Sequence, residues 1–405
     1  MTTTQIDSTV QNGSPTLAAE LTDKAADLVP LLRSAGDQTD KNRRLSDEVI
    51  GALEEAGVFR LCSPKKFGGH EQDIRTFTDV ISEIGRGCGS AAWVTFISNT
   101  GAWIAGYFSD EAQREVFEGN PNARFIGVLA PTAKTTRVDG GYMVNGRWGY
   151  ASGSLHADWG LMAAPLEQQD GSQQLGLILV PMSETTIEDT WYSVGVRGSG
   201  SNTVIAKDVF VPDHRAMPLA EVMKFNALGE ADSSLIYRQA FAATAVIAVA
   251  APVLGMARAA LELTRDRMNG GDKRIAYSTY TDARQAPAMQ LQLAEAASLI
   301  EIGHTVVKTW CDRIVAGARE LRELSVTERA QMRAELGVAM RHCRDGVNLL
   351  MSVQGTSGFM ESNPVQRVWR DIETATRHGL LTPEIPMEIY GRALFDDFPA
   401  LSAFL

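Results

Sequence analysis

Two kinds of side chain in this sequence are suited to chemistry near neutral pH: imidazoles and small hydroxyls. The six histidines are widely separated, and none has the spacing of a metal site such as HExxH. No serine lies in the GxSxG pattern of a hydrolase nucleophile. The stretch Gly198-Ser-Gly-Ser201 places two hydroxyls beside glycines, where they either bind a phosphate or form a plain turn. It resembles part of a dinucleotide loop, but Thr203 replaces the third glycine, so we expect no NAD(P)H site.

A further candidate hydroxyl lies at the end of an alternating segment. In Trp148-Gly-Tyr-Ala-Ser, alternation along a strand predicts that Trp148, Tyr150 and Ser152 share one face. His156 follows four residues later, and His378 lies far along the chain in a region of helical periodicity. A lone histidine is more often structural than catalytic, so residue type alone gives neither of them a role.

The elements that must position these residues form consecutive blocks. The predicted domains are a disordered tail (1–15), an N-terminal α-helical domain (16–121), a β domain (122–230) and a C-terminal helical bundle domain (231–405). Long helices are expected near 234–268, 285–317 and 326–354. Because no helix pattern separates the strands, we predict an α+β fold whose middle domain is a mostly antiparallel barrel or sandwich and whose last domain is a four-helix bundle.

Composition and charge disfavour several classes of function. The 405-residue chain has 44% hydrophobic and 21% charged residues, as globular proteins do. Its net charge is −11, so a broad nucleic-acid-binding surface is disfavoured. The longest apolar run, near 239–256, contains Pro252 and continues into a charged stretch, which indicates a buried helix rather than a membrane span. The first residues lack the pattern of a secretory signal and the four cysteines are far apart, so we expect a cytoplasmic protein.

Several motifs within residues 20–395 resemble the acyl-CoA dehydrogenase superfamily, and together they are highly specific. They are Leu53-Glu-Glu-Ala-Gly-Val-Phe-Arg-Leu, Pro64-Lys-Lys-Phe-Gly-Gly, Asn145-Gly-Arg-Trp-Gly-Tyr-Ala-Ser-Gly, Val194-Gly-Val-Arg-Gly-Ser, Gln354-Gly-Thr-Ser-Gly-Phe and Arg367-Val-Trp-Arg-Asp. The resemblance implies the fold of that superfamily and a flavin that lies against the strand containing Ser152.

The sequence departs from the dehydrogenases of this superfamily where they carry a catalytic carboxylate. Those enzymes need a base for the proton alpha to the thioester, yet the two family positions hold Gly379 and Ala245. A better resemblance is to the oxygenase components of two-component flavin-dependent monooxygenases. Its signals are Leu-Ala-Pro-Thr at 129–132, Ser152-Gly-Ser-Leu-His-Ala-Asp-Trp, Arg197-Gly-Ser-Gly-Ser-Asn and Trp369-Arg-Asp followed by Arg377-His378. This branch implies a C4a-hydroperoxyflavin, formed from O2 and FMNH2 or FADH2, that oxygenates a small aromatic or heteroaromatic molecule.

The same resemblance implies roles for individual residues. The predicted catalytic residues are Ser152, a hydroxyl donor near flavin N5, and His378, an imidazole that can stabilise negative charge. His156 is the candidate for substrate contact, and no metal is expected. The predicted cofactor-binding residues are Tyr150, Ser152, Ser199, Ser201, Arg267, Gln354, Gly355, Thr356 and His378, with Arg267 as the phosphate partner.

The predicted partners are an aromatic substrate and a separate NAD(P)H:flavin reductase. The resemblance also implies a homotetramer in which the segment Gln354–Phe359 completes a neighbour's flavin site. We expect the substrate pocket to involve loops near 95–104 and 270–284. FMN versus FAD, and carbon hydroxylation versus N- or S-oxidation, stay open. Two alternatives remain: an acyl-CoA dehydrogenase with a displaced base and a non-catalytic flavin-binding protein.

Overall fold

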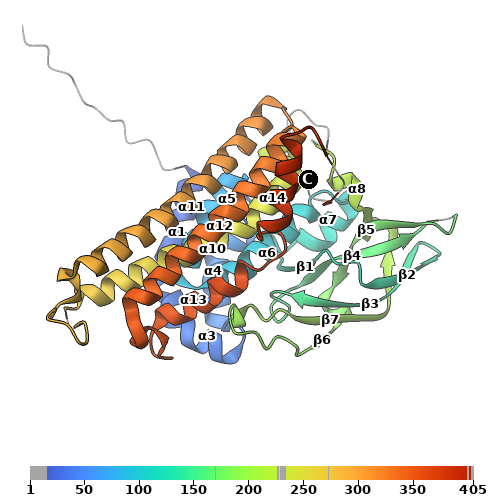
Figure 1. Ribbon diagram of the computed structural model, residues 1–405. Coiled ribbons are helices and arrows are strands. Elements are labelled where there is room, and N and C mark those ends of the chain that lie inside the picture. Colours follow the sequence, from blue (N-terminus) through green and yellow to red (C-terminus); the bar gives the residue numbers. More distant parts are fainter. Residues whose placement is uncertain are drawn as a thin grey trace, which may run out of the picture.

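The chain runs from a block of helices through two sheets into a bundle of long helices (Figure 1). The computed structural model describes residues 16–168, 170–225, 228, 234–271, 273–398 and 401–402. The predicted tail, residues 1–15, lies outside the described residues. The order of helices and strands confirms the predicted α+β architecture.

The first block of the described chain consists of helices that precede the sheets. They are α1 (Leu17–Asp27), α2 (Val29–Ser34), α3 (Gly36–Asn42), α4 (Asp47–Glu55), α5 (Ile74–Gly87), α6 (Gly89–Ala105) and α7 (Asp110–Phe117). The α4 helix begins where the sequence predicts, because the Ser46 hydroxyl accepts a hydrogen bond from the Val49 amide. The α6 helix is apolar and almost wholly buried, so it lies at the centre of the molecule. The predicted loop near 95–104 is therefore wrong: these residues belong to α6.

The middle block is a sandwich of two four-stranded sheets, ordered β1-β4-β5-β8 and β2-β3-β7-β6. The strands are β1 (Phe125–Val128), β2 (Ala133–Val138), β3 (Gly141–Ala151), β4 (Trp159–Glu167), β5 (Gln173–Pro181), β6 (Thr186–Glu188), β7 (Asn202–Pro212) and β8 (Ala216–Pro218). Strand pairs are antiparallel apart from β1 and β4, which run parallel. The prediction of a mostly antiparallel sandwich is confirmed.

One of these sheets is buried on both faces. Along β4, Met162 and Ala164 point into the core between the sheets, whereas Leu161 and Ala163 point into the core shared with the helices. A strand buried on both sides must be apolar at every position. The same reason explains the continuous apolar run of β5. This sheet therefore fixes the sandwich against the helices.

The last block begins with two short helices and continues as the bundle. Its members are α8 (Leu219–Val222), α9 (Leu235–Arg238), α10 (Phe241–Asn269), α11 (Pro287–Glu320), α12 (Val326–Gln354), α13 (Pro364–Ala375) and α14 (Glu384–Ala393). The α10, α11, α12 and α13 helices pack on one another, as predicted. The α10 helix starts later than the predicted residue 234, because Gln239 and Ala240 have extended backbones. Its length and apolarity would suffice to cross a membrane, but 89% of its apolar window is buried inside the protein.

Two glycines allow the first block to contact the bundle through the backbone itself. The α5 helix crosses α10 at Gly85 and Gly255. A Cβ atom on Gly255 would lie 2.0 Å from the Ser82 carbonyl oxygen, and one on Gly85 would lie 2.8 Å from the Pro252 carbonyl oxygen. A larger residue at either position would force the two helices apart.

Candidate active site

Three serine hydroxyls form a hydrogen-bonded chain between the sandwich and the helices. Ser152 follows β3, whereas Ser199 ends the 3-10 turn η4 (Arg197–Ser199) and Ser201 directly precedes β7. The Oγ atoms of Ser152 and Ser201 are 2.8 Å apart, and those of Ser201 and Ser199 are 2.6 Å apart. All three side chains are buried. The fold therefore brings together three of the predicted cofactor-binding residues, from segments about 50 residues apart.

The direction of each hydrogen bond in this chain follows from its two ends. The Ser199 hydroxyl donates to the Val196 carbonyl at 2.7 Å, so its oxygen accepts the proton of Ser201. Each hydroxyl carries a single proton, so Ser152 in turn donates to Ser201. The Ser152 oxygen accepts from the Trp93 indole nitrogen at 3.1 Å. Ser152 must therefore release Ser201 before it can donate a hydrogen bond to any ligand.

Trp93 joins this serine chain to the other predicted catalytic residue. It lies in the first turns of α6, and its ring meets the His378 imidazole edge-on, with centroids 5.9 Å apart and planes at 62°. Sequence reasoning missed Trp93, because α6 is apolar all round and its aromatic residues look like ordinary core. Trp93 thus contacts both Ser152 and His378.

His378 follows the end of α13 and presents a neutral imidazole. Its Nδ1 accepts a hydrogen bond from the Leu380 amide at 3.3 Å, which leaves the proton on Nε2. The side chain is exposed on one side, yet the surrounding protein removes enough water to lower the pKa of the imidazole. Both effects favour the neutral form at pH 7. The ring can therefore donate a hydrogen bond from Nε2 without carrying a positive charge.

The predicted alternation from Trp148 to Ser152 is wrong. Trp148 is fully buried between the sheets, and its indole donates to the Ala163 carbonyl at 3.0 Å. Tyr150 adopts a left-handed backbone with φ +58°, and the pairing of β3 with β7 shifts register between Trp148 and Ala151. Such a bulge reverses the side-chain pattern that follows it. Tyr150 consequently points outward with 78% of its surface exposed, against the ring of Trp191.

A cleft of about 330 Å³ opens beside the serine chain. Its lining residues are Gly149, Tyr150, Thr190, Trp191, Tyr192, Ser193, Ser201 and Thr203. Exposed aromatic rings offer stacking faces, and hydroxyls along one edge offer hydrogen bonds, so the lining fits a planar ring system with polar edges. An exposed tyrosine on a left-handed backbone is costly unless something requires it. These residues are thus compatible with an isoalloxazine ring.

The other predicted cofactor-binding residues gather elsewhere, at the end of the bundle that lies away from the two sheets (Figure 1). Gln354 ends α12, and its buried side chain bonds Thr264 at 3.2 Å and Asn363 at 3.4 Å. Gly355 has φ +63° and ψ −161°, a conformation open to glycine alone, and Thr356 is exposed. Within one subunit these residues and the serine chain form two separate groups.

Two cations lie together in this second group. Arg267 is exposed in the last turn of α10 and makes no ion pair within the described residues. Lys273 donates a hydrogen bond to the Val353 carbonyl, and burial together with the charge of Arg267 lowers its pKa to about 8. Two like charges held side by side suit an anion such as a phosphate. The predicted phosphate contact of Arg267 stays a prediction, and Lys273 is a neighbouring cation that sequence reasoning did not single out.

His156 lies in the turn that follows Ser152, where its amide donates to the Gly153 carbonyl at 2.9 Å. Its imidazole is half-buried, and burial and the charges of Arg44 and Arg124 lower its pKa to about 4. Its Nε2 atom is buried without a hydrogen-bond partner in the described residues. Its predicted role in substrate binding stays a prediction.

Two family models match the chain. Residues 25–118 match the model described as acyl-CoA dehydrogenase, N-terminal domain, and residues 247–383 match acyl-CoA dehydrogenase, C-terminal domain. The chain is 31% identical to the flavin-dependent monooxygenase oxygenase subunit HsaA of Rhodococcus jostii, over 91% of this chain and 96% of that protein. It is also 31% identical to the FADH(2)-dependent resorcinol hydroxylase oxygenase component of a Rhizobium species, over 88% and 90%.

Solved structures show the same relationship. XiaF from a Streptomyces species, solved with FADH2 and glycerol, superposes with a TM-score of 0.91 at 30% identity, covering 95% of this chain and 97% of that one. The HsaA monooxygenase from Mycobacterium tuberculosis superposes with a TM-score of 0.88 at 30% identity, covering 96% and 100%.

Proposed function

Because this chain belongs to the flavin-dependent monooxygenase oxygenase subunits, which share the acyl-CoA dehydrogenase fold, we propose that it hydroxylates a small aromatic molecule. Reduced flavin from a separate reductase would supply the electrons that activate O2. Two similar proteins favour FADH2: the resorcinol hydroxylase component is named for it, and XiaF was solved with it. We therefore propose FADH2 as the flavin and phenols as the substrate class.

The observation that carries this proposal is the pair of hydrogen-bond donors about Trp93. His378 offers a neutral Nε2–H, and the Ser152 hydroxyl becomes a second donor once it releases Ser201. Neutral donors can stabilise developing negative charge on oxygen without giving up a proton. Trp93 and the helix α6 that carries it are buried, so the Ser152 side of this pair is shielded from water, whereas His378 is exposed.

The geometry does not favour the dehydrogenase alternative. The two positions of the expected base are Ala245, buried in α10, and Gly379, just after α13. Asp371 is a buried carboxylate on α13, but it is only 4% exposed and bonds the Val196 amide. A carboxylate enclosed in this way cannot reach a substrate proton.

We also propose that the protein assembles so that Arg267, Lys273 and Gln354 of one subunit complete the flavin site of another. The separation of these residues from Ser152 within one subunit supports this proposal. A homotetramer would satisfy it. Sedimentation of the flavin-loaded protein tests the assembly, and a stable monomer that binds flavin would contradict it.

The test of function mixes the protein with reduced FAD, O2 and a panel of phenols, and measures hydroxylated product and H2O2 per O2 consumed. We expect product from at least one phenol. Reduction of bound FAD by an acyl-CoA would instead support the dehydrogenase, and neither reaction would support a non-catalytic flavin-binding protein. His378→Ala should lose product, whereas His342→Ala, a histidine on α12 outside the site, should not.

A further inference from the structure

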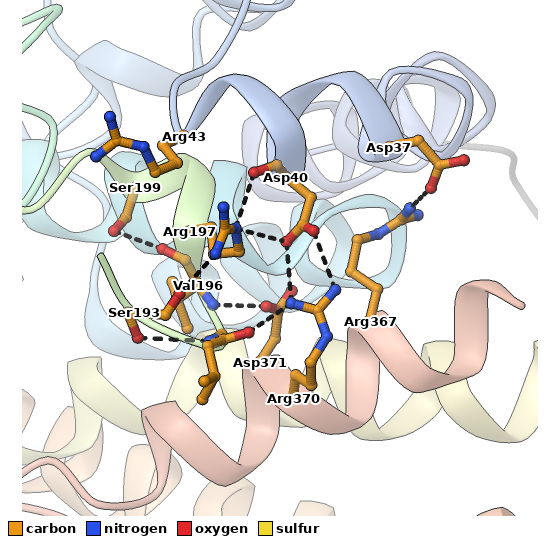
Figure 2. Close-up of polar contacts among 12 residues, drawn as sticks. Asp37, Asp40, Arg43, Ser193, Val196, Arg197, Ser199, Arg367, Arg370 and Asp371 are labelled. Carbon is orange, nitrogen blue, oxygen red and sulfur yellow. Dashed lines mark hydrogen bonds and ion pairs between the residues drawn. The ribbon is translucent and has the colours of Figure 1, made fainter. Parts of the chain in front are cut away.

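A buried carboxylate on α13 lies where the sandwich meets the helices. Asp371 is only 4% exposed, and its Oδ1 accepts a hydrogen bond from the Val196 amide at 2.6 Å (Figure 2). Its Oδ2 lies at the beginning of α6, where a Cβ atom on Gly89 would come within 2.9 Å. Asp371 therefore contacts two segments that are distant in sequence, and both lead to the serine chain.

The first of these segments needs support. Val196 has φ +50° and ψ +34°, a left-handed conformation that is costly for a β-branched residue. The neighbouring Gly195 packs directly on α13, since a Cβ atom there would lie 2.0 Å from the Arg370 carbonyl oxygen. The hydrogen bond from the Val196 amide to Asp371 thus holds a residue with a strained backbone against α13, where the packing is tight.

The conformation of Val196 decides how the hydroxyls point. Its carbonyl accepts the Ser199 hydroxyl at 2.7 Å and the Trp191 indole at 3.0 Å. Because Ser199 donates to this carbonyl, Ser201 donates to Ser199 and Ser152 donates to Ser201. A rotation of Val196 would remove the final acceptor and leave the direction of the whole chain undefined.

The second segment holds the other side of Ser152. Asp371 lies at the N-terminus of α6, where the helix dipole favours a negative charge. Trp93 follows Gly89 by four residues on the same helix and donates to Ser152. The carboxylate therefore bonds the segment that carries Ser199 and Ser201, and it packs beside the first turn of the helix that carries Trp93.

The neighbouring arginines form ion pairs of their own. Arg367 pairs with Asp37, and Arg370 pairs with Asp40 at 3.0 Å (Figure 2). Arg370 also donates a hydrogen bond to the Val194 carbonyl, so it helps to hold the segment before Val196. Asp371 bonds the Val196 amide itself and takes part in no ion pair within the described residues.

We propose that Asp371 is a positioning residue of the oxygenation site: it holds Val196 by a hydrogen bond and packs against the beginning of α6, so that the Ser152 hydroxyl points in a single direction. The structural part of this inference stands on the flavin-free protein, and its effect on catalysis rests on the proposed function.

Hydrogen exchange of the flavin-free protein tests the structural part. Asp371→Leu removes the acceptor, and we expect amides of residues 190–203 to exchange about tenfold faster or more, the factor for losing one charge-assisted hydrogen bond. Asp371→Asn keeps an acceptor oxygen and should exchange like the parent. Asp37→Asn, which breaks an ion pair to the same helix, is the matched control and should also leave 190–203 unchanged. If Asn and Leu behave alike, or if Leu changes nothing, the proposal is wrong.

If Asp371→Leu folds poorly, a second substitution that relieves the backbone strain at Val196 provides another test. Glycine adopts the left-handed conformation at little cost. Asp371→Leu combined with Val196→Gly should therefore regain soluble expression. Failure of this rescue would show that Asp371 does not act through Val196, and would overturn the proposal.

The catalytic part is tested by measuring H2O2 and product per O2 consumed, with saturating reduced FAD, O2 and a phenol that the unmutated protein hydroxylates. Asp371→Leu should release several times more H2O2 per O2 than the parent, while Asp371→Asn should restore coupling. If the unmutated protein makes no product, the proposed function is wrong, but the positioning role of Asp371 is still decided by the hydrogen-exchange experiment. Unchanged coupling in Asp371→Leu, with faster exchange at 190–203, would refute the catalytic part.

Discussion

Replacing Ser152 by alanine should destabilise the protein before any flavin is bound. Its Oγ accepts from Trp93 at 3.1 Å and donates to Ser201 at 2.8 Å. Alanine leaves the indole N–H of Trp93, a side chain only 8% exposed, without an acceptor. An unsatisfied buried donor costs about 1–3 kcal/mol, so we expect the free energy of unfolding to fall by that amount.

Ser154 offers a matched control in the same segment. It is equally buried, and its hydroxyl makes one hydrogen bond, to the Gly200 carbonyl at 2.9 Å. That carbonyl keeps a second donor, the Asn202 amide at 2.7 Å, when Ser154 becomes alanine. No buried group loses its last hydrogen-bond partner in Ser154→Ala, so the free energy of unfolding should fall by only about 0.5–1.5 kcal/mol. Ser152→Ala should therefore be the more destabilising of the two.

Urea denaturation at a fixed protomer concentration measures both variants, and a double-mutant cycle isolates the hydrogen bond. Trp93→Phe removes the donor but keeps an aromatic ring. In the Trp93→Phe background, Ser152→Ala leaves no indole N–H without an acceptor. The loss of unfolding free energy caused by Ser152→Ala should therefore be smaller there by about 1 kcal/mol or more. Additive costs, within about 0.5 kcal/mol, would refute the hydrogen bond between Trp93 and Ser152.

Three further predictions concern ionisable groups. His378→Ala should lower product per O2 at saturating reduced flavin far more than it weakens flavin binding; unchanged coupling would contradict its role as a donor. The pKa of Asp371 is raised from 3.8 to about 6 by burial, so the folded state binds its proton more tightly than the unfolded chain. The unfolding free energy of the parent minus that of Asp371→Asn should therefore fall by about 3 kcal/mol as pH rises from about 4 to about 6; a flat difference would count against this. Because Lys273 has a pKa of about 8, flavin affinity should decline as pH rises through 8, and Lys273→Arg should abolish the decline in a fluorescence titration.

The sequence predicted the long helices well, because their periodicity repeats over many turns. The predicted helix 326–354 has the same ends as α12, where Ser325 and Glu328 form a capping box. The parallel pairing of β1 with β4 was beyond reach, since two other strands separate them in sequence. The start of α10 was also missed, because Gln239 and Ala240 carry no glycine or proline signal for the break before Phe241.

The site was predictable in part. Hydroxyls beside glycines pointed to Ser199 and Ser201, but the alternation toward Ser152 failed because a left-handed Tyr150 gives no signal in residue type. Trp93 and its partners meet only through the tertiary fold. No pattern in a single sequence marks such contacts, so the residue linking both predicted catalytic side chains came from the structure alone.

The glycine crossing of α5 and α10 also limits how the molecule can move. Helices whose backbones touch at Gly85 and Gly255 cannot slide past one another without collision, so the two helical blocks behave as a single rigid frame. The cleft is lined by residues 149–150, 190–193, 201 and 203, which belong to the sandwich side, so this crossing keeps the helical blocks fixed while leaving the lining of the cleft free of that constraint.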